Sequence, residues 1–227
     1  MKTIILIGGS KGIGNAILKN LLKHSKVINI SRTSPEETHT NLTHYSCDAV
    51  KEKLPEIDAA DGLIYCPGSI NLKPISRLSI DDFKDDFDIN VLGAVKAIQK
   101  YLTILKSGNK PAILLFSTVA AKLGMPFHAS IATSKAGVEG LVKSLGAELA
   151  PIVRINAIAP TVTDTALASK LLRNEKMIEN ITERHPLKKF LNPEEVAHMA
   201  EFLISDKAAS LSGQIFEMDC GIVSFKI

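Results

Sequence analysis

The stretch TIILIGGSKGIG, residues 3–14, decides the fold of this chain. Its apolar part, Thr3–Ile7, predicts a buried strand, and the residues from Gly12 through Lys23 carry apolar side chains at the spacing of a helix. Gly8 permits a tight turn, Gly12 lets a phosphate approach the backbone, and Gly14 lets the helix pack closely on the strand. A glycine triplet can serve loop shape alone, but its place between a strand and a helix predicts a dinucleotide site, with the helix N–H groups facing the pyrophosphate. The expected contact residues in this turn are Gly8, Ser10, Lys11, Gly12, Ile13 and Gly14.

Short apolar runs alternate with helical patterns along the rest of the chain. Such runs are typical of strands that helices cover on both faces, so the alternation predicts an α/β fold with a doubly wound parallel sheet of Rossmann type. We expect a single domain over residues 1–227, because no repeat, linker or low-complexity segment interrupts the pattern. The expected strands are Thr3–Ile7, Lys26–Ile30, Leu63–Cys66, Ala112–Ser117, Ile152–Ile158 and Gln214–Met218, and the expected helices are Gly12–Lys23, Ser79–Lys106, Ser130–Leu149 and Pro193–Ile204.

Two segments depart from the regular alternation. The span from Asp48 to Ile57 is too short for a long helix, which predicts one abbreviated crossover. The polar stretch Thr165–Arg184 has a helical pattern with few core positions. It fits a mobile lid over a substrate site and fits a surface helical hairpin equally well, and the pattern does not choose between them.

Composition excludes several classes of protein. The chain has 45% hydrophobic and 22% charged residues and a net charge of +3, and the basic residues are scattered rather than gathered into a stripe. This balance does not indicate a nucleic-acid or membrane partner. Cys47, Cys66 and Cys220 are odd in number and widely spaced, which argues against a disulfide framework or a metal site and favours the cytoplasm. The apolar run that ends at Gly8 is too short for an export signal, and no stretch approaches the roughly 20 apolar residues of a membrane span.

The end of the second expected strand favours one dinucleotide. Sites for NAD place a carboxylate there to bind the adenosine ribose, whereas this strand ends in Ser31 and Arg32. Arg32 can pair with a 2′-phosphate, Ser31 can donate to it, and Lys11 reaches the same region. The alternative is a pair of surface cations. We expect NADP(H) as the cofactor.

In these motifs and their order the chain resembles the short-chain dehydrogenase/reductase family along its whole length. The glycine spacing matches that family. Asp48 resembles its adenine contact, Asn90 within Asp88-Ile89-Asn90-Val91 its proton-relay asparagine, and Lys135 within Ser134-Lys135-Ala136-Gly137 its catalytic lysine. The resemblance implies a sheet of about seven strands and a homotetramer or dimer. It also implies that Gly68, Asn90, Lys135, Pro160, Thr163 and Thr165 contact the cofactor. The segment Arg154–Pro160, which flanks the nicotinamide in that family, and the tail from Pro193 to Gly221 match the family as well.

The chain departs from the family's pattern at the catalytic residues. The family's tyrosine lies four residues before its lysine, and that position is Ile131 here. The serine position, 17 residues before the lysine, is Thr118. The family's Asn-Asn-Ala-Gly signature is also reduced to Tyr65-Cys66-Pro67-Gly68, which keeps only the glycine.

Loss of the tyrosine leaves the proton source open. General acid catalysis typically contributes about 10²–10⁴-fold, and Ile131 cannot donate a proton. His128, seven residues before Lys135, has the spacing at which enoyl-thioester reductases of the superfamily carry their tyrosine, and histidine titrates near neutrality. It is either a substitute acid or a loop histidine without a chemical role. Ser130 is a weaker candidate, because a free hydroxyl is a poor acid.

Two functions follow. The first is an NADP(H)-dependent oxidoreductase that acts on a small carbonyl compound or an activated alkene, with non-standard proton delivery. The second is a catalytically silent NADP(H)-binding protein that serves as a sensor or an assembly subunit. Only the first predicts substrate-dependent consumption of NADPH.

Overall fold

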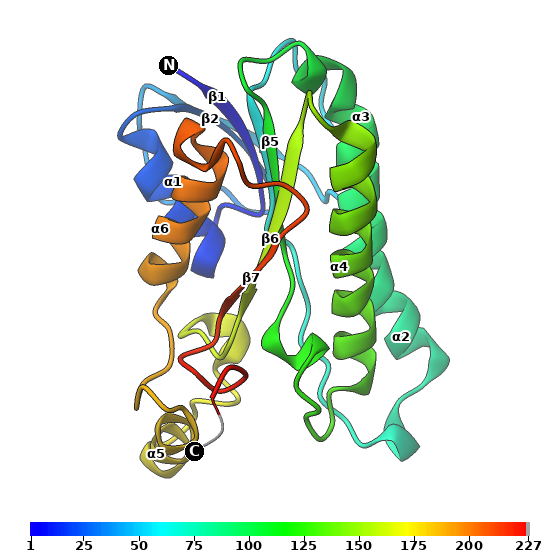
Figure 1. Ribbon diagram of the computed structural model, residues 1–227, viewed down its shortest axis with the longest axis vertical. Coiled ribbons are helices and arrows are strands. Elements are labelled where there is room, and N and C mark those ends of the chain that lie inside the picture. The colour runs from blue at the N-terminus through cyan, green and yellow to red at the C-terminus, as the bar shows by residue number, and fades with distance from the viewer. Residues whose placement is uncertain (226–227) are drawn as a thin grey trace.

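One parallel sheet forms the centre of the molecule. The computed structural model describes residues 1–225, and its seven strands lie in the order β3-β2-β1-β4-β5-β6-β7 (Figure 1). This confirms the predicted doubly wound sheet of Rossmann type. The strands are β1 Thr3–Ile7, β2 Lys26–Ser31, β3 Leu42–Ser46, β4 Gly62–Tyr65, β5 Ala112–Phe116, β6 Arg154–Pro160 and β7 Ile215–Met218.

Helices cover both faces of the sheet, which explains why the inner strands are apolar on both sides. Helices α1 (Gly12–Leu22) and α6 (Pro193–Ile204) pack on one face, and α3 (Gly93–Lys106) and α4 (Ala129–Leu149) on the other (Figure 1). Every residue of β5 is buried, and neighbouring positions of β1 serve opposite cores, Ile5 one and Leu6 the other. Burial of this kind contributes roughly 25 cal/mol per Å² of apolar surface and fixes the strand register.

The long helix predicted over Ser79–Lys106 is interrupted. The structure forms α2 at Ile80–Phe87, one π-helical turn at Asp88–Leu92, and then α3. Single π-helical turns inside helices occur frequently at functional sites, and this one carries Asn90. The amphipathic pattern continues across all three elements, so it could not mark the interruption.

The remaining connections agree in outline with the expectations. No helix lies between β3 and β4 within the described chain, which confirms the abbreviated crossover. The segment predicted as a lid or a surface hairpin contains a short turn at Ala166–Ala168 and α5 at Glu175–Arg184. Ala168 and Ile181 are its buried contacts.

The topology places a crevice at the carboxyl ends of the central strands. The chain runs from β1 outward through β2 to β3 and then returns to place β4 on the other side of β1. Ligands of open α/β sheets bind outside the carboxyl ends at such a reversal of strand order. The glycine turn after β1 and the loop after β4 both lie at this edge.

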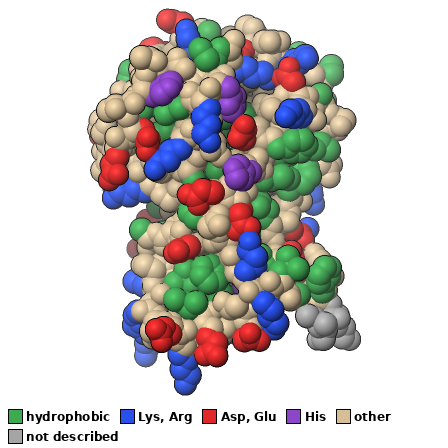
Figure 2. Space-filling view, turned by 90° about the vertical axis from the view of Figure 1, so that its left-hand side faces the viewer, with side chains coloured by type: hydrophobic (Ala, Val, Ile, Leu, Met, Phe, Trp, Pro, Cys, Tyr) green, Lys and Arg blue, Asp and Glu red, His purple; other side chains and the backbone are tan. Residues whose placement is uncertain are grey.

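The surface gives no sign of a large single-sign field on the face that carries α1 and α6. Lys and Arg side chains there are interspersed with Asp and Glu (Figure 2). Within residues 1–225 no helix is both long enough and apolar enough to cross a bilayer.

Candidate active site

The turn after β1 has backbone geometry that requires glycine. Gly8 and Gly12 have φ angles of +84° and +53°, a region that side chains disfavour. At Gly14 a Cβ atom would lie 2.1 Å from the carbonyl oxygen of Gly8, so any side chain there would displace the turn. The turn therefore holds the start of α1 directly against the end of β1.

The N-terminus of α1 is open, unlike those of two other helices. Lys11 precedes α1 and gives it no side-chain cap, and the first turn contains no acidic residue. By contrast, α2 and α6 begin with complete capping boxes at Ser79 and Asn192. The unpaired N–H groups and the positive end of the helix dipole at α1 suit an anion, so this edge fits the pyrophosphate of a dinucleotide.

A ring of hydrogen bonds joins the glycine turn to the end of β2. The Gly9 N–H donates to Asn29 Oδ1 at 3.0 Å, and Asn29 Nδ2 donates to Ser31 Oγ at 2.9 Å. The Ser31 hydroxyl donates to the Thr33 carbonyl, and the Thr33 hydroxyl donates back to Ser10 Oγ, both at 3.0 Å. Asn29 is fully buried, so its side chain fixes the turn relative to β2.

Asn29 and Thr33 are not among the residues predicted from the sequence. Asn29 is the single polar residue within the run Val27–Ile30 of β2. A buried amide needs hydrogen-bond partners, so this residue was the signal that the sequence offered. The same ring turns the Ser31 hydroxyl inward, toward the Thr33 carbonyl, and leaves Ser10 and Thr33 nearer the surface.

Basic side chains flank this ring. Arg32 and Lys11 are both exposed, and neither forms an ion pair within the described residues. Asp48, after β3, uses Oδ1 to accept the N–H groups of Val50 and Lys51, which orders the short crossover. The end of β2 and the glycine turn thus carry one uncommitted cation each, and no carboxylate follows directly after β2.

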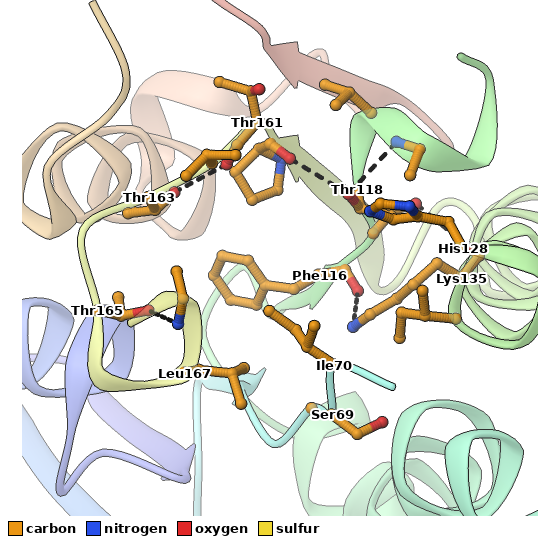
Figure 3. A pocket seen from close by; sticks show the side chains of 18 of the residues that line it. Ser69, Ile70, Phe116, Thr118, His128, Lys135, Thr161, Thr163, Thr165 and Leu167 are labelled. Atoms are coloured by element: carbon orange, nitrogen blue, oxygen red, sulfur yellow. Dashed lines mark hydrogen bonds between the residues drawn. The ribbon is translucent and has the colours of Figure 1, made fainter. Parts of the chain in front are cut away.

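The structure brings most of the expected reaction residues into one pocket at the same edge of the sheet (Figure 3). Thr118, His128, Ile131 and Lys135 all line it. So do the expected cofactor contacts Ile13, Gly68, Pro160, Thr163 and Thr165. The other expected cofactor residues lie outside this lining, at the glycine turn, at the ends of β2 and β3 and, for Asn90, in the π-helical turn.

Lys135 is buried in the pocket wall. Its Nζ donates to the Phe116 carbonyl at 2.8 Å (Figure 3). Burial lowers the pKa of Lys135 to about 8, and the nearby carboxylate of Asp86 acts in the opposite direction. Ile131, one helical turn before it, is 4% exposed and fills the wall with an apolar side chain.

No tyrosine within the described residues lines the pocket. The Tyr65 hydroxyl donates to the Ile89 carbonyl and the Tyr101 hydroxyl to the Pro55 carbonyl, while Tyr45 lies half-exposed on β3. Burial raises the pKa of Tyr65 and Tyr101, so neither phenol is disposed to give up its proton. Burial also raises the pKa of the pocket thiol Cys66 to about 12, which keeps that thiol protonated.

Thr118 and His128 line the pocket, and each side chain has one polar atom that is hydrogen-bonded to the backbone. Thr118 Oγ1 accepts the Ala120 N–H at 3.3 Å and lies 3.4 Å from the Pro160 carbonyl. His128 Nδ1 lies 2.7 Å from the Pro126 carbonyl, which requires the proton to be on Nδ1. Neutral His128 therefore has an acceptor at Nε2 and must gain a proton before it can give one.

Asn90 lies directly behind the pocket wall. Its Nδ2 donates to the Asp86 carbonyl at 2.7 Å and to Ser69 Oγ at 3.1 Å. Its Oδ1 is buried and has no partner among the described residues. A Cβ atom on Gly68 would lie 3.4 Å from this oxygen and 3.5 Å from Lys135 Nζ, so Gly68 leaves room between them. An unsatisfied acceptor opposite an amine suits a bound polar group.

Comparison with known proteins decides the family. The family model described as enoyl-(acyl carrier protein) reductase matches residues 38–223. The chain belongs to the short-chain dehydrogenase/reductase family. The 3-oxoacyl-[acyl-carrier-protein] reductase FabG of Rickettsia felis is 28% identical over 98% of this chain and 97% of that protein.

Solved structures of short-chain dehydrogenases/reductases agree. Ligand-free aldohexose dehydrogenase of Thermoplasma acidophilum has a TM-score of 0.90 and 27% identity over 99% of this chain and 95% of that one. A 4-hydroxyisoleucine dehydrogenase complexed with NADH has a TM-score of 0.89 and 26% identity over 100% of both chains. As a member of this family the chain is an oxidoreductase with a site for a nicotinamide cofactor, which the open helix end and the pocket fit.

Proposed function

We propose that the chain is an NADP(H)-dependent oxidoreductase of a small, neutral and largely apolar carbonyl compound or activated alkene. One observation supports it above all. The open N-terminus of α1, flanked by Lys11 and Arg32, leads into an apolar pocket that contains Lys135 and Thr118. The site thus combines features suited to a phosphate-bearing dinucleotide with space for a small substrate.

The preference for NADP(H) rests on charge at the end of β2. Arg32 offers a planar guanidinium that can pair with a phosphate, and Lys11 adds a second cation from the glycine turn. Ser10 and Thr33 supply hydroxyl groups beside them. Within the family this choice varies, since the 4-hydroxyisoleucine dehydrogenase holds NADH. The absence of a carboxylate after β2 is what favours NADP(H) here.

Each pocket residue has a distinct task in the proposed reaction. The nicotinamide, when bound, supplies or accepts the hydride. Lys135 and the buried oxygen of Asn90 hold ribose hydroxyl groups, and Pro160, Thr163 and Thr165 contact the nicotinamide half. Thr118 donates a hydrogen bond to the substrate oxygen.

The lining indicates the substrate class. The lining consists mainly of apolar side chains, among them Ile70, Leu72, Val119, Met125, Ile131, Leu167 and Leu171. Lys135 is the only fully charged side chain in the lining within the described residues. A cationic substrate would leave its charge without a partner, which is costly in such a pocket, and the one cation that an anion could pair with, Lys135, is assigned to the ribose in this proposal. Leu167, from the segment after Thr165, is exposed and closes one side, which supports a lid role for that segment.

A group other than tyrosine exchanges the proton in this proposal. His128 is the candidate that its spacing from Lys135 singles out, and it lines the pocket. Replacement by alanine tests it, because a histidine that delivers the proton contributes roughly 10²–10⁴-fold to turnover. Unchanged turnover in His128→Ala removes His128 from the reaction.

We also propose a homo-oligomer, a tetramer or a dimer, that works in the cytoplasm. The outer side of α4 carries the exposed small residues Ala136 and Gly140, and a Cβ on Gly140 would meet nothing within 4 Å. Such a side allows close approach of another copy. The three free cysteines fit a reducing compartment. Sedimentation of the purified protein tests the assembly, and a monomer at all concentrations would contradict it.

One titration and one screen test the proposed function. NADPH and NADH are titrated by fluorescence, and NADPH is expected to bind at least about 10-fold tighter, as one charge-assisted contact predicts. Consumption of NADPH is then followed with cyclohexanone, acetophenone, benzaldehyde and, as an activated alkene, 2-cyclohexenone. Tighter binding of NADH would refute the cofactor assignment. Tight NADPH binding without turnover of any substrate class would refute the enzymatic assignment.

A further inference from the structure

A buried carboxylate lies behind the pocket wall, where the expected reaction residues do not account for it. Asp86, on the last turn of α2, is 2% exposed. Ser69 Oγ donates to its Oδ1 at 2.5 Å, and Ser130 Oγ donates to its Oδ2 at 2.6 Å. No lysine, arginine or histidine within the described residues forms an ion pair with it. A buried carboxylate without an ion pair is costly, so its presence calls for a reason.

Ser69 connects this carboxylate to the pocket. It follows Gly68 in the loop after β4 and lines the pocket beside Ile70 (Figure 3). Its oxygen accepts from Asn90 Nδ2 at 3.1 Å while its hydrogen points to Asp86. A hydroxyl oxygen has two lone pairs, so Ser69 can still accept one hydrogen bond from a ligand in the pocket.

We propose that Ser69 and Asp86, rather than His128, exchange the reaction's proton with the substrate oxygen. This inference rests on the proposed oxidoreductase function and names its proton route. In this route Ser69 is the catalytic residue, because it is the group that exchanges the proton directly with the substrate oxygen. Asp86 is the proton store behind it, and Ser130 and Asn90 orient the pair.

The step balances in both directions. In alcohol oxidation the substrate O–H bond breaks and its proton passes to Ser69 Oγ, while the Ser69 proton passes to Asp86 Oδ1. The carbinol C–H bond breaks at the same time, and its hydride goes to NADP⁺. The products are the carbonyl compound, NADPH and protonated Asp86, which returns its proton to solvent. In reduction each transfer runs backward, and Asp86 begins in its acid form.

The position of the cluster explains how Ile131 can be tolerated. Ser130 and Ser134 face α2 and the π-helical turn, whereas Ile131 and Lys135 line the pocket. The polar groups therefore lie in a layer directly under the apolar wall. Ser69 is the one member of the Ser69–Asp86–Ser130 cluster that lines the pocket within the described chain.

Two variants and a matched control test the route. Asp86→Asn keeps the shape and can still accept one hydroxyl, but it cannot take up a proton. Ser69→Ala removes the relay and leaves the carboxylate. Asp85→Asn makes the same chemical change on the adjacent, exposed residue of α2. Cyclohexanol oxidation and cyclohexanone reduction are measured over a range of pH, together with NADPH affinity and thermal unfolding.

The expected result is a loss of turnover by at least about 100-fold in Asp86→Asn and Ser69→Ala, with NADPH affinity kept, and wild-type turnover in Asp85→Asn. The groups whose charges act around Asp86 are Lys135 on α4 and Asp82 on α2, the latter paired with Lys73. Lys135 and Asp82 both remain in Asp86→Asn. If the fall of the oxidation rate at low pH disappears in this variant, the group that causes the fall is therefore Asp86 itself. In protein with ¹³C-labelled side-chain carboxyl groups and no substrate, the resonance of Asp86 is the one that Asp86→Asn lacks. This resonance should shift in Ser69→Ala and remain unchanged in Asp85→Asn.

Other outcomes overturn the route. Wild-type turnover in Asp86→Asn or Ser69→Ala refutes it and leaves the proposed function intact. If turnover falls in Asp86→Asn but the decrease of the rate at low pH is unchanged, Asp86 only links α2 to α4 structurally. This result also refutes the proton route. If Asp86→Asn fails to fold, Ser69→Ala decides alone, since it leaves the buried carboxylate bound to Ser130. No turnover in the wild type refutes the proposed function first and the route with it.

Discussion

Replacement of Lys135 by methionine should make the protein more stable and less active at neutral pH. The side chain is buried, and burial lowers the pKa of Lys135 from 10.5 to about 8. At about 1.36 kcal/mol per pH unit, this difference means that folding disfavours the charged form by roughly 3 kcal/mol. Methionine has a similar shape and no charge. It loses the hydrogen bond from Nζ to the Phe116 carbonyl, a contribution of about 1 kcal/mol.

The net gain is therefore roughly 2 kcal/mol at pH 7, or a rise in Tm of about 4–8 °C for a chain of this size. The sign depends on pH. The pKa of folded Lys135 lies below that of the unfolded chain, so its cost is complete below about pH 8 and disappears as the pH rises toward 10.5. Above that range the wild type should be the more stable protein by about 1 kcal/mol, because only the lost hydrogen bond remains.

The assay is thermal unfolding of both proteins between pH 7 and 11, without ligand. Lys143→Met, an exposed lysine on the same helix, is the control and should change stability by less than about 0.5 kcal/mol. NADPH binding should weaken in Lys135→Met and not in the control. A lower Tm in Lys135→Met at pH 7, or a difference that does not vary with pH, would refute the argument from burial.

Three further substitutions test the cofactor half of the site. Arg32→Ala should weaken NADPH binding by roughly 10–100-fold and leave NADH binding unchanged, as expected for one charge-assisted phosphate contact; an equal effect on both titrations would count against a 2′-phosphate contact. Asn29→Leu leaves the Gly9 N–H without a buried acceptor and should cost about 2–3 kcal/mol in urea unfolding, while an unchanged midpoint would mean that the ring adds no stability. Gly14→Ala should abolish NADPH binding, because its Cβ would lie 2.1 Å from the Gly8 oxygen, whereas Gly124→Ala, with nothing within 4 Å, should bind NADPH normally in the same titration.

Most of the fold could be predicted from the sequence because the sheet is covered on both faces. Continuous apolar runs such as Ala112–Phe116 mark strands that have no solvent side. The edge strand β3, Leu42–Ser46, is largely exposed and polar, and no apolar run marked it. The π-helical turn at Asp88–Leu92 left no signal either, since one extra residue within a helical turn does not alter the amphipathic pattern over a short window.

The candidate site likewise contains residues that the sequence predicted and residues that it did not. Glycine spacing located the turn, because only glycine fits the φ angles of Gly8 and Gly12 and the contact at Gly14. The partners of Asn29 come from three different strands and loops, so no spacing in the sequence joins them. Asp86 could not be predicted as a site residue for another reason. The helix IDDFKDDF carries four aspartates, and only packing against α4 decides which of them is buried.

The two halves of this site place different demands on the chain. The cofactor half depends on backbone geometry, so it is specified by a few glycines and tolerates variation in side chains around them. The reaction half depends on where a proton can be held, and any buried acid-base group that reaches the substrate oxygen through hydrogen bonds can fulfil that demand. An isoleucine on the pocket wall therefore does not by itself mean an inactive protein. Because Asp86 lies behind Ser69 rather than in the wall, its substitution should alter proton transfer while leaving the shape of the pocket unchanged, which is how a relay differs from a wall residue.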